Sequence, residues 1–245
     1  MHLKSTTLIV YNTEVEVRIM KKLILFDIDG TLIHTGGAGT MSMNLAFREL
    51  FGVDDAFKNI PMAGKTDMQI MREGLMTHGV PEPDGKLENM INTYLRFLKT
   101  EIDNPMRTIK PGIQAVLELL RDMNTPLGLL TGNLEKGARI KLKAFGLNDY
   151  FPDGAFGSDH EDRDMLLPIA IEKFSKRGFT FAPEDCVVIG DTPRDVKCAK
   201  VHGARCIAVA TGPYSKDDLL ATDADVVFDS LRDVDRCMEF INRVS

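Results

Sequence analysis

Two aspartates in the segment Asp27-Ile28-Asp29-Gly30-Thr31-Leu32 have the type and spacing needed for group transfer and proton transfer. They follow Leu23–Phe26, a wholly apolar run typical of a buried strand. Side chains at positions i and i+2 of an extended segment point the same way, so we expect both carboxylates to face one site. One carboxylate could attack an electrophile while the other moves a proton. Aspartate and glycine are also common in turns after strands, where they need no catalytic role.

A second polar segment, Thr131-Gly132-Asn133, follows the apolar run Leu127–Leu130. A hydroxyl and backbone N–H groups at the beginning of a helix can hold a phosphate, because the helix dipole and the free N–H groups both favour an anion there. Simple N-capping by Asn133 is the alternative interpretation.

A third polar segment, Gly190-Asp191-Thr192-Pro193-Arg194-Asp195, follows Val187–Ile189. A carboxylate such as that of Asp191 suits Mg²⁺, which binds a few carboxylates together with water. The alternative is a helix start in which Thr192 is the N-cap and Asp195 completes a capping box. Both interpretations hold together if Asp195 caps the helix and also faces a metal.

The elements that must position these residues alternate between strands and helices. Short apolar runs recur along the chain, and amphipathic helical stripes lie between them. The further runs are Cys206–Val209 and Val226–Phe228, and the stripes include Ile113, Val116, Leu117 and Leu120, then Leu166, Leu167, Ala170, Ile171 and Phe174. This alternation predicts an α/β fold with a doubly wound, Rossmann-like parallel sheet, whose ligands bind at the carboxyl ends of the strands.

The interval 35–104 interrupts the alternation, because it contains helical patterns and little strand signal. One pattern runs through Met43 and Leu50 and another through Leu87 and Leu98. We therefore predict a small α-helical cap at 35–104, inserted into a catalytic core formed by 20–34 and 105–245. Residues 1–19 form an N-terminal extension of unknown role, in which alternating Val15, Val17 and Ile19 allow a strand.

Together, the Asp-x-Asp-Gly-Thr-Leu and Gly-Asp-Thr-Pro-x-Asp motifs resemble those of haloacid dehalogenase (HAD) superfamily phosphatases, in particular the phosphoglycolate-phosphatase-like group with a helical cap after the first motif. The resemblance covers residues 22 to about 230. It implies that Asp27 is the nucleophile and that Asp29 is the general acid and base. It also implies a Mg²⁺ site formed by Asp27, the backbone carbonyl of Asp29, Asp191 and Asp195, and a phosphate site formed by Thr131, Gly132 and Asn133.

The family also places a basic residue, usually lysine, before the helix that precedes the Gly-Asp motif. Arg163 is the best match here, and an arginine stays charged and can hold a phosphate with two donors. An exposed arginine near a helix start is the alternative. In the segment 64–67, which resembles a substrate-facing cap loop of these relatives, Lys65 is expected to touch the substrate, unless it is a solvated lysine beside a helix cap.

The resemblance implies Mg²⁺-dependent hydrolysis of a small phosphate monoester through an aspartyl-phosphate. Asp29 favours phosphatases and phosphomutases over the superfamily's dehalogenases, because a departing alkoxide needs a proton. A phosphomutase is the alternative enzyme, and a catalytically idle binding or regulatory protein is the alternative from another class. We rank the latter low because all four motif aspartates are present.

The bulk composition is consistent with a small phosphorylated metabolite as the partner. The formal net charge of −6 argues against nucleic acid or an anionic membrane. Four cysteines without a Cys-x-x-Cys pair are typical of small buried side chains in a reducing compartment, and no apolar run is long enough to span a bilayer. We therefore expect a cytoplasmic protein, and we make no prediction of its oligomeric state.

Overall fold

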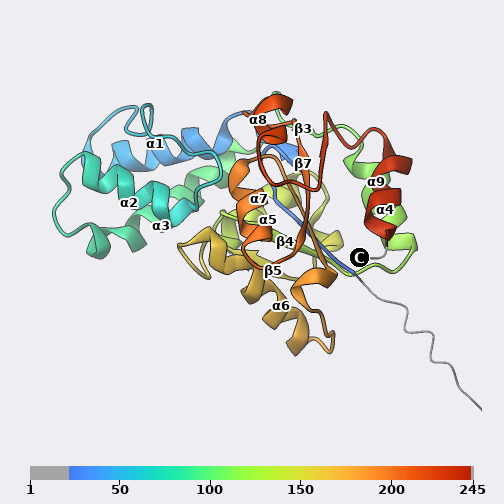
Figure 1. Cartoon of the computed structure of the whole chain (residues 1–245). Helices are drawn as coiled ribbons and strands as arrows, with labels where there is room; N and C mark the ends of the chain where they lie inside the picture. Colours follow the sequence, from blue (N-terminus) through green and yellow to red (C-terminus); the bar gives the residue numbers. More distant parts are fainter. Residues whose placement is uncertain (1–21, 244–245) are drawn as a thin grey trace, which may run out of the picture.

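The computed structural model describes residues 22–243 of the chain (Figure 1). The predicted extension 1–19 and the strand suggested within it lie outside the described residues.

The core is a six-stranded sheet with the order β5-β4-β1-β6-β7-β8, in which every neighbouring pair is parallel. The strands are β1 (Leu23–Phe26), β4 (Leu127–Thr131), β5 (Gly154–Phe156), β6 (Cys186–Gly190), β7 (Arg205–Val209) and β8 (Val226–Phe228). The predicted α/β fold with a parallel sheet is therefore confirmed. Strand β5 was not predicted, because three residues beginning with glycine carry too little apolar pattern.

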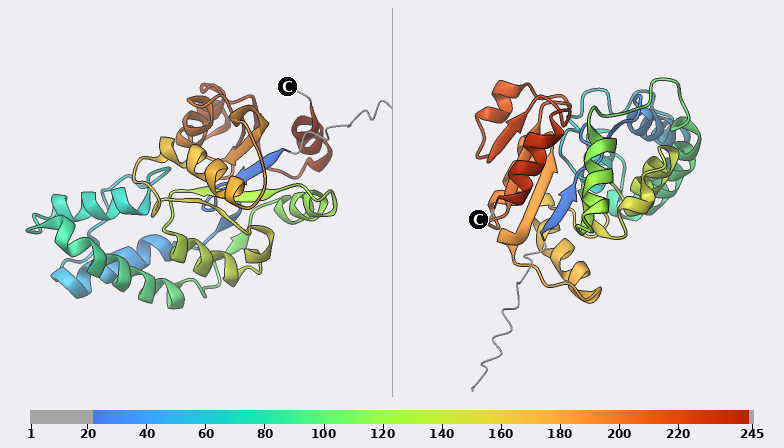
Figure 2. Two further views of the ribbon diagram at one scale, coloured as in Figure 1. Left: turned by 90° about the horizontal axis from the view of Figure 1, so that it is seen from below. Right: turned by 90° about the vertical axis from the view of Figure 1, so that its right-hand side faces the viewer.

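Helices cover both faces of the sheet, as the two views in Figure 2 show. Alternate β1 side chains point to opposite faces of the sheet. Ile24 and Phe26 pack in one apolar cluster, and Leu23 and Leu25 pack in the other. The first cluster includes residues of α4 (Ile113–Asp122), α5 (Glu135–Ala144) and α9 (Val234–Asn242). The second includes residues of α6 (Leu166–Lys176), α7 (Pro193–Lys200) and α8 (Lys216–Leu220). Short 3₁₀ turns occur at Asn148–Tyr150, Arg163–Met165 and Pro183–Asp185.

Three helices form a separate group at one end of the molecule (Figures 1 and 2). They are α1 (Ala38–Phe51), α2 (Asp67–Thr77) and α3 (Pro83–Glu101). The helical patterns predicted from the sequence lie in α1 and α3. Helix α2 was not predicted. It packs closely against the Phe57 ring at Gly74, where a Cβ atom would lie only 2.5 Å from the ring. The boundaries 35–104 for a cap domain stay a prediction.

The helical group has its own apolar cluster, and one residue of that cluster, Leu134, comes from the loop before α5 in the core. The two connections to the core also pair with each other, because β2 (Ile33–His34) and β3 (Thr108–Ile109) form a short antiparallel ladder. The three helices therefore contact the core next to the carboxyl end of the sheet.

Two further predictions concern membrane-spanning helices and the cysteines. Among residues 22–243, no helix combines the length and the apolar character needed to cross a membrane. The four cysteines, Cys186, Cys198, Cys206 and Cys237, are buried and free, as predicted for small core side chains.

Candidate active site

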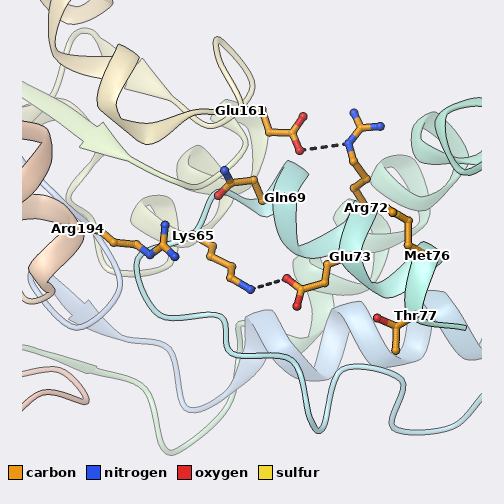
Figure 3. A pocket seen from close by; sticks show the side chains of 8 residues that line it. All are labelled: Lys65, Gln69, Arg72, Glu73, Met76, Thr77, Glu161 and Arg194. Atoms are coloured by element: carbon orange, nitrogen blue, oxygen red, sulfur yellow. Dashed lines mark hydrogen bonds and ion pairs between the residues drawn. The ribbon is translucent and has the colours of Figure 1, made fainter.

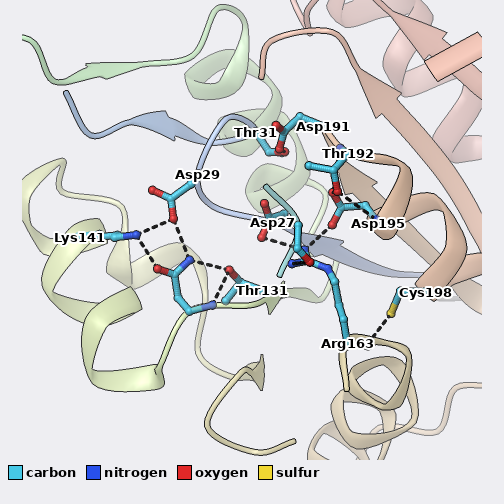
Figure 4. Close-up of polar contacts among 12 residues, drawn as sticks. Asp27, Asp29, Thr31, Thr131, Lys141, Arg163, Asp191, Thr192, Asp195 and Cys198 are labelled. Carbon is cyan, nitrogen blue, oxygen red and sulfur yellow. Dashed lines mark hydrogen bonds and ion pairs between the residues drawn. The ribbon is translucent and has the colours of Figure 1, made fainter. Parts of the chain in front are cut away.

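Asp27 directly follows the central strand β1. Its backbone N–H donates to Ile189 O at 2.9 Å, which continues the pairing of β1 with β6, and the residue is only 6% exposed. Arg163 Nη2 lies 3.1 Å from Asp27 Oδ1. The same nitrogen also pairs with Asp195, so one guanidinium bridges two buried carboxylates (Figure 4).

Arg163 reaches this position because a 3₁₀ turn at Arg163–Met165 precedes α6. Asp162 caps the turn by accepting from Asp164 N at 3.0 Å. Arg163 Nη1 donates to Gly64 O at 3.3 Å, a carbonyl in the loop that leads to α2. The exposed-arginine interpretation is therefore wrong, since Arg163 is 4% exposed. Its role in phosphate binding stays a prediction.

Three carboxylates gather beside Arg163. One oxygen from each of Asp27, Asp191 and Asp195 lies within 4.8 Å of the other two. Thr31 Oγ1 donates to Asp191 Oδ1 at 2.8 Å. Asp195 Oδ2 accepts from the N–H of Thr192 at 3.0 Å and from its hydroxyl at 2.7 Å, so Asp195 caps α7 while its other oxygen contacts Arg163. The capping role and the place in the cluster therefore hold together.

The electrostatics of this cluster favour a bound cation. Burial is the main cause that raises the pKa of Asp27 and of Asp191; neighbouring carboxylates add to it, and Arg163 acts in the opposite direction. Fully ionised, the three carboxylates exceed the one guanidinium by two negative charges. A divalent cation with oxygen ligands would neutralise that excess, so the residues fit Mg²⁺.

Gly30 lets the loop after the first motif approach this cluster. Its φ is +87°, in the left-handed region, and a Cβ atom at Gly30 would lie 2.3 Å from Asp191 Oδ2. Glycine is required here because a side chain would displace the Asp191 carboxylate. The side chain of Asp29 itself is outside the carboxylate cluster, so only its backbone carbonyl remains as the predicted metal ligand.

The predicted phosphate loop lies at the end of β4. Thr131 Oγ1 accepts from Asn133 Nδ2 at 2.8 Å, which leaves the hydroxyl proton free to donate. Asn133 Nδ2 also donates to Asp29 Oδ2 at 2.8 Å. The N-capping interpretation of Asn133 is wrong: Leu134 is the N-cap of α5, and the N–H of Glu135 in the first turn donates to Ser158 Oγ at 3.1 Å.

Asp67, at the start of α2 in the helical group, is hydrogen-bonded to the predicted phosphate loop. Asp67 N donates to Gly132 O at 2.7 Å, and Asp67 Oδ2 accepts from Leu134 N at 2.9 Å. A Cβ atom at Gly132 would lie 2.3 Å from Lys65 O, so the two segments are in close backbone contact. Burial raises the pKa of Asp67 to about 6, although the positive charge of Lys141 opposes the shift.

Lys141 was not predicted as a site residue. Its Nζ donates to Asp29 Oδ2 at 2.6 Å and to Asn133 Oδ1 at 2.5 Å, and the residue is 4% exposed (Figure 4). A signal was present in the sequence, because Lys141 shares the buried face of α5 with Ala138 and Leu142. A lysine on an apolar helical face needs a buried partner.

Lys65 lines the cavity, but its ammonium pairs with Glu73 of α2 (Figure 3). Arg72, from the same helix, pairs with Glu161 of the core at 3.1 Å. These residues border a separate surface groove of about 580 Å³ between α2 and the core. The structure therefore gives Lys65, in the loop before α2, an ion-pair partner on that helix, and its predicted contact with substrate stays a prediction.

A cavity of about 490 Å³ separates the helical group from the sheet. Of the predicted site residues, Asp27, Asp29, Lys65, Gly132, Asn133, Arg163 and Asp191 line it. Thr131 and Asp195 are buried and are not among the lining residues. The opposite wall is largely apolar, with Met43, Met62, Ile70 and Tyr94. Such a chamber suits a small ligand with one highly charged end.

The sequence pattern of the family described as "Haloacid dehalogenase-like hydrolase" matches residues 24–209. The chain belongs to this family. Residues 24–209 include both aspartate motifs, the phosphate loop, Arg163 and the helical group. The predicted membership of the HAD superfamily is confirmed, and the chain is an enzyme of the phosphatase type that the resemblance implied.

Similar proteins include two bacterial phosphatases. The chain is 26% identical over 223 residues to "Phosphoglycolate phosphatase" of Rhodospirillum rubrum, covering 86% of this chain and 88% of that protein. It is 29% identical over 227 residues to "Phosphoglycolate phosphatase 1" of Pseudomonas aeruginosa, covering 90% and 80%. Among solved structures, CbbY from Rhodobacter sphaeroides in complex with phosphate has a TM-score of 0.69 at 20% identity, covering 87% of this chain and 96% of that one. That similarity concerns the fold.

Proposed function

We propose that this HAD phosphatase hydrolyses a small phosphate monoester with Mg²⁺ and forms an aspartyl-phosphate on Asp27. The observation that carries the proposal is the position of Asp27 at the end of the central strand, where it lines the cavity, contacts Arg163 and belongs to the carboxylate cluster. In a parallel sheet the carboxyl end of a central strand is where ligands bind.

In the first half-reaction, the substrate phosphate is held by Arg163, the Thr131 hydroxyl and the N–H groups of the phosphate loop. A carboxylate oxygen of Asp27 attacks phosphorus, and a new P–O bond forms as the bond to the leaving group breaks. The bonding electrons stay with the leaving oxygen, which takes a proton from Asp29. Fixed donors around the transferring group contribute most of the stabilisation of such a transition state.

In the second half-reaction, Asp29 removes a proton from water as the water oxygen attacks phosphorus. The bond between phosphorus and Asp27 breaks, which releases inorganic phosphate and restores the carboxylate. Asp29 thus regains the proton that it donated, and the cycle balances.

Asp27, Asp191, Asp195 and the backbone carbonyl of Asp29 would hold Mg²⁺, and Asp195 also contacts Arg163 and caps α7. When bound, Mg²⁺ offsets the mutual repulsion of the carboxylates and the phosphate and stabilises charge on the transferring oxygens. The excess of two negative charges in the cluster supports this assignment.

The substrate is expected to be small because the cavity is covered by α1, α2 and α3 and has a volume of about 490 Å³. The names of the bacterial relatives support a compact phosphorylated metabolite. A screen of phosphorylated metabolites with Mg²⁺, scored by released inorganic phosphate, would identify the substrate class.

The covalent step is tested with Asp27→Asn, which is nearly isosteric but removes the nucleophile. We expect no turnover above background, whereas Asp149→Asn, an exposed aspartate of the core, should behave as wild type. Circular dichroism and thermal unfolding check that both variants fold. A rate for Asp27→Asn above a tenth of the wild-type rate, a loss of less than about 1.4 kcal/mol, would contradict an aspartyl-phosphate mechanism.

A further inference from the structure

The buried ammonium of Lys141 contacts the side chain of Asp29 directly. Lys141 Nζ and Asn133 Nδ2 both donate to the same oxygen, Asp29 Oδ2, at 2.6 Å and 2.8 Å. Within residues 22–243, no protein side chain donates to the other oxygen, Oδ1. The Asp29 side chain is 41% exposed, while that of Lys141 is 5% exposed. Asp29 Oδ2 is therefore fixed by two hydrogen bonds, and Oδ1 is available to a ligand in the cavity.

The position of Lys141 is stabilised by charge as well as by hydrogen bonds. Burial alone lowers the pKa of a lysine, but the carboxylates of Asp29 and Asp67 outweigh this effect and raise the pKa of Lys141. Both carboxylates therefore favour the charged form of the ammonium. A charge buried to this degree is costly unless it is paired, so its two carboxylate neighbours account for its presence.

The same ammonium lies at the contact between the core and the helical group. A Cβ atom at Gly39, in α1, would lie 3.6 Å from Lys141 Nζ. Asp67, at the first position of α2, is fixed by hydrogen bonds to Gly132 and Leu134 on either side of Asn133. The helical group thus encloses the pair formed by Lys141 and Asp29.

We infer that Lys141 is a positioning residue: it holds the Asp29 carboxyl by Oδ2, so that Oδ1 is directed at the oxygen of the leaving group. This inference rests on the proposed function. In the first half-reaction the proton moves from Asp29 to the leaving oxygen as the P–O bond breaks, and Lys141 keeps its own protons throughout. The ammonium and the substrate make no contact in this assignment.

A comparison of leaving groups tests this role. The ester p-nitrophenyl phosphate releases a weakly basic phenolate that needs little protonation, whereas an alkyl ester such as glycerol 2-phosphate releases a strongly basic alkoxide. The parameter kcat/KM reports the steps up to the first bond cleavage, so it isolates the proton donated by Asp29. For Lys141→Met, we expect kcat/KM for the alkyl ester to fall about 100-fold, the scale of general-acid catalysis, and kcat/KM for the aryl ester to fall less than about fivefold.

Four further variants complete the test. Asp29→Asn should show the same selective loss, and the double variant Asp29→Asn/Lys141→Met should lose no more than Asp29→Asn alone, because both changes remove one function. Lys141→Gln keeps a donor for Asp29, so it should retain more activity on the alkyl ester than Lys141→Met. Lys143→Met, an exposed lysine of the same helix, serves as the matched control and should resemble wild type. If Lys141→Met does not fold, the ratio of the two esters is measured on Lys141→Gln.

Equal losses on both esters, or losses that add fully in the double variant, would overturn the positioning role. Such a result would instead assign Lys141 to folding or to direct substrate contact. If wild-type protein with Mg²⁺ hydrolysed neither ester and no metabolite, the proposed function would fail, and the inference with it. An active wild-type enzyme with an unchanged ester ratio in the Lys141 variants would overturn the inference alone.

Discussion

Arg163 Nη2 lies 3.1 Å from Asp27 Oδ1, and the same guanidinium is bound to Asp195 at the start of α7. An arginine supplied by a 3₁₀ turn before α6 therefore contacts the predicted nucleophile, Asp27. Its Nε is buried without a partner among the described residues, and Nη1 contacts a carbonyl of the loop before α2. The basic group of this site is thus tied to two carboxylates and to the loop that covers the cavity.

Replacing Arg163 by alanine should lower kcat/KM by at least about 2 kcal/mol, roughly thirtyfold, because a buried charge-assisted contact to the transferring phosphoryl group is lost. Arg163→Lys should lose less, since the charge is kept and only the second donor disappears. Steady-state kinetics with any ester that the wild type hydrolyses would measure both. The exposed Arg177→Ala is the matched control. A near-normal kcat/KM for Arg163→Ala would remove Arg163 from the phosphate site.

Chelation with EDTA should abolish activity, and added Mg²⁺ should restore it. Mg²⁺ should also raise the melting temperature more at pH 7.5 than at pH 5. Burial and mutual repulsion raise the pKa values of Asp27 and Asp191, so a cation must displace more protons at the lower pH than at the higher one. Asp191→Ala should weaken this stabilisation. A Mg²⁺-induced shift that is independent of pH, or full activity in chelator, would contradict the metal site.

Asp67→Asn should stabilise the protein at neutral pH relative to wild type, but not at pH 4. The folded-state pKa of about 6 exceeds the ordinary value of 3.8, so the folded wild type binds more protons between these pH values and loses stability as the pH rises through them. The loss is at most about 3 kcal/mol, from roughly two pKa units. Asparagine can still accept from Leu134 N–H, so that hydrogen bond is retained.

Urea unfolding of wild type and Asp67→Asn between pH 4 and pH 8 would measure the difference. Asp149→Asn, which removes an exposed carboxylate, should show no comparable trend. A stability difference between Asp67→Asn and wild type that does not change with pH would mean that Asp67 is not ionised within a buried environment.

The protein should act as a hydrolase and not as a phosphomutase. A mutase must shield its aspartyl-phosphate from water and hold a second phosphate, which calls for a second basic group facing the cavity from the cap loop. Lys65 is the one basic residue in the loop 61–67, and its ammonium is paired with Glu73. With small monophosphates, Mg²⁺ and no bisphosphate activator, we expect sustained release of inorganic phosphate over many turnovers. Isomerised sugar phosphate that forms only after a bisphosphate is added would reverse this assignment.

The class of fold and the main carboxylates could be predicted from local sequence patterns alone. Leu23–Phe26 is apolar throughout because a central parallel strand is buried on both faces, so its end could be located without a structure. Asp27, Asp191 and Thr131 were found for the same reason, since each comes at or just after the end of such a run. Local composition is sufficient where burial and position along one strand define the site.

Contacts between residues far apart in sequence became known from the packing of the folded chain. Lys141 pairs with Asp29 across 112 positions of sequence, and Asp67 reaches the core through hydrogen bonds to Gly132 and Leu134. Arg163 could be proposed only through a family resemblance, because an arginine before a helix is ordinarily exposed. These contacts depend on how α2, α5 and the 3₁₀ turn pack around the sheet, and a buried charge is recognised only when its partner is known. Periodicity places a side chain on a helix face, while the identity of its partner depends on packing between elements far apart in sequence.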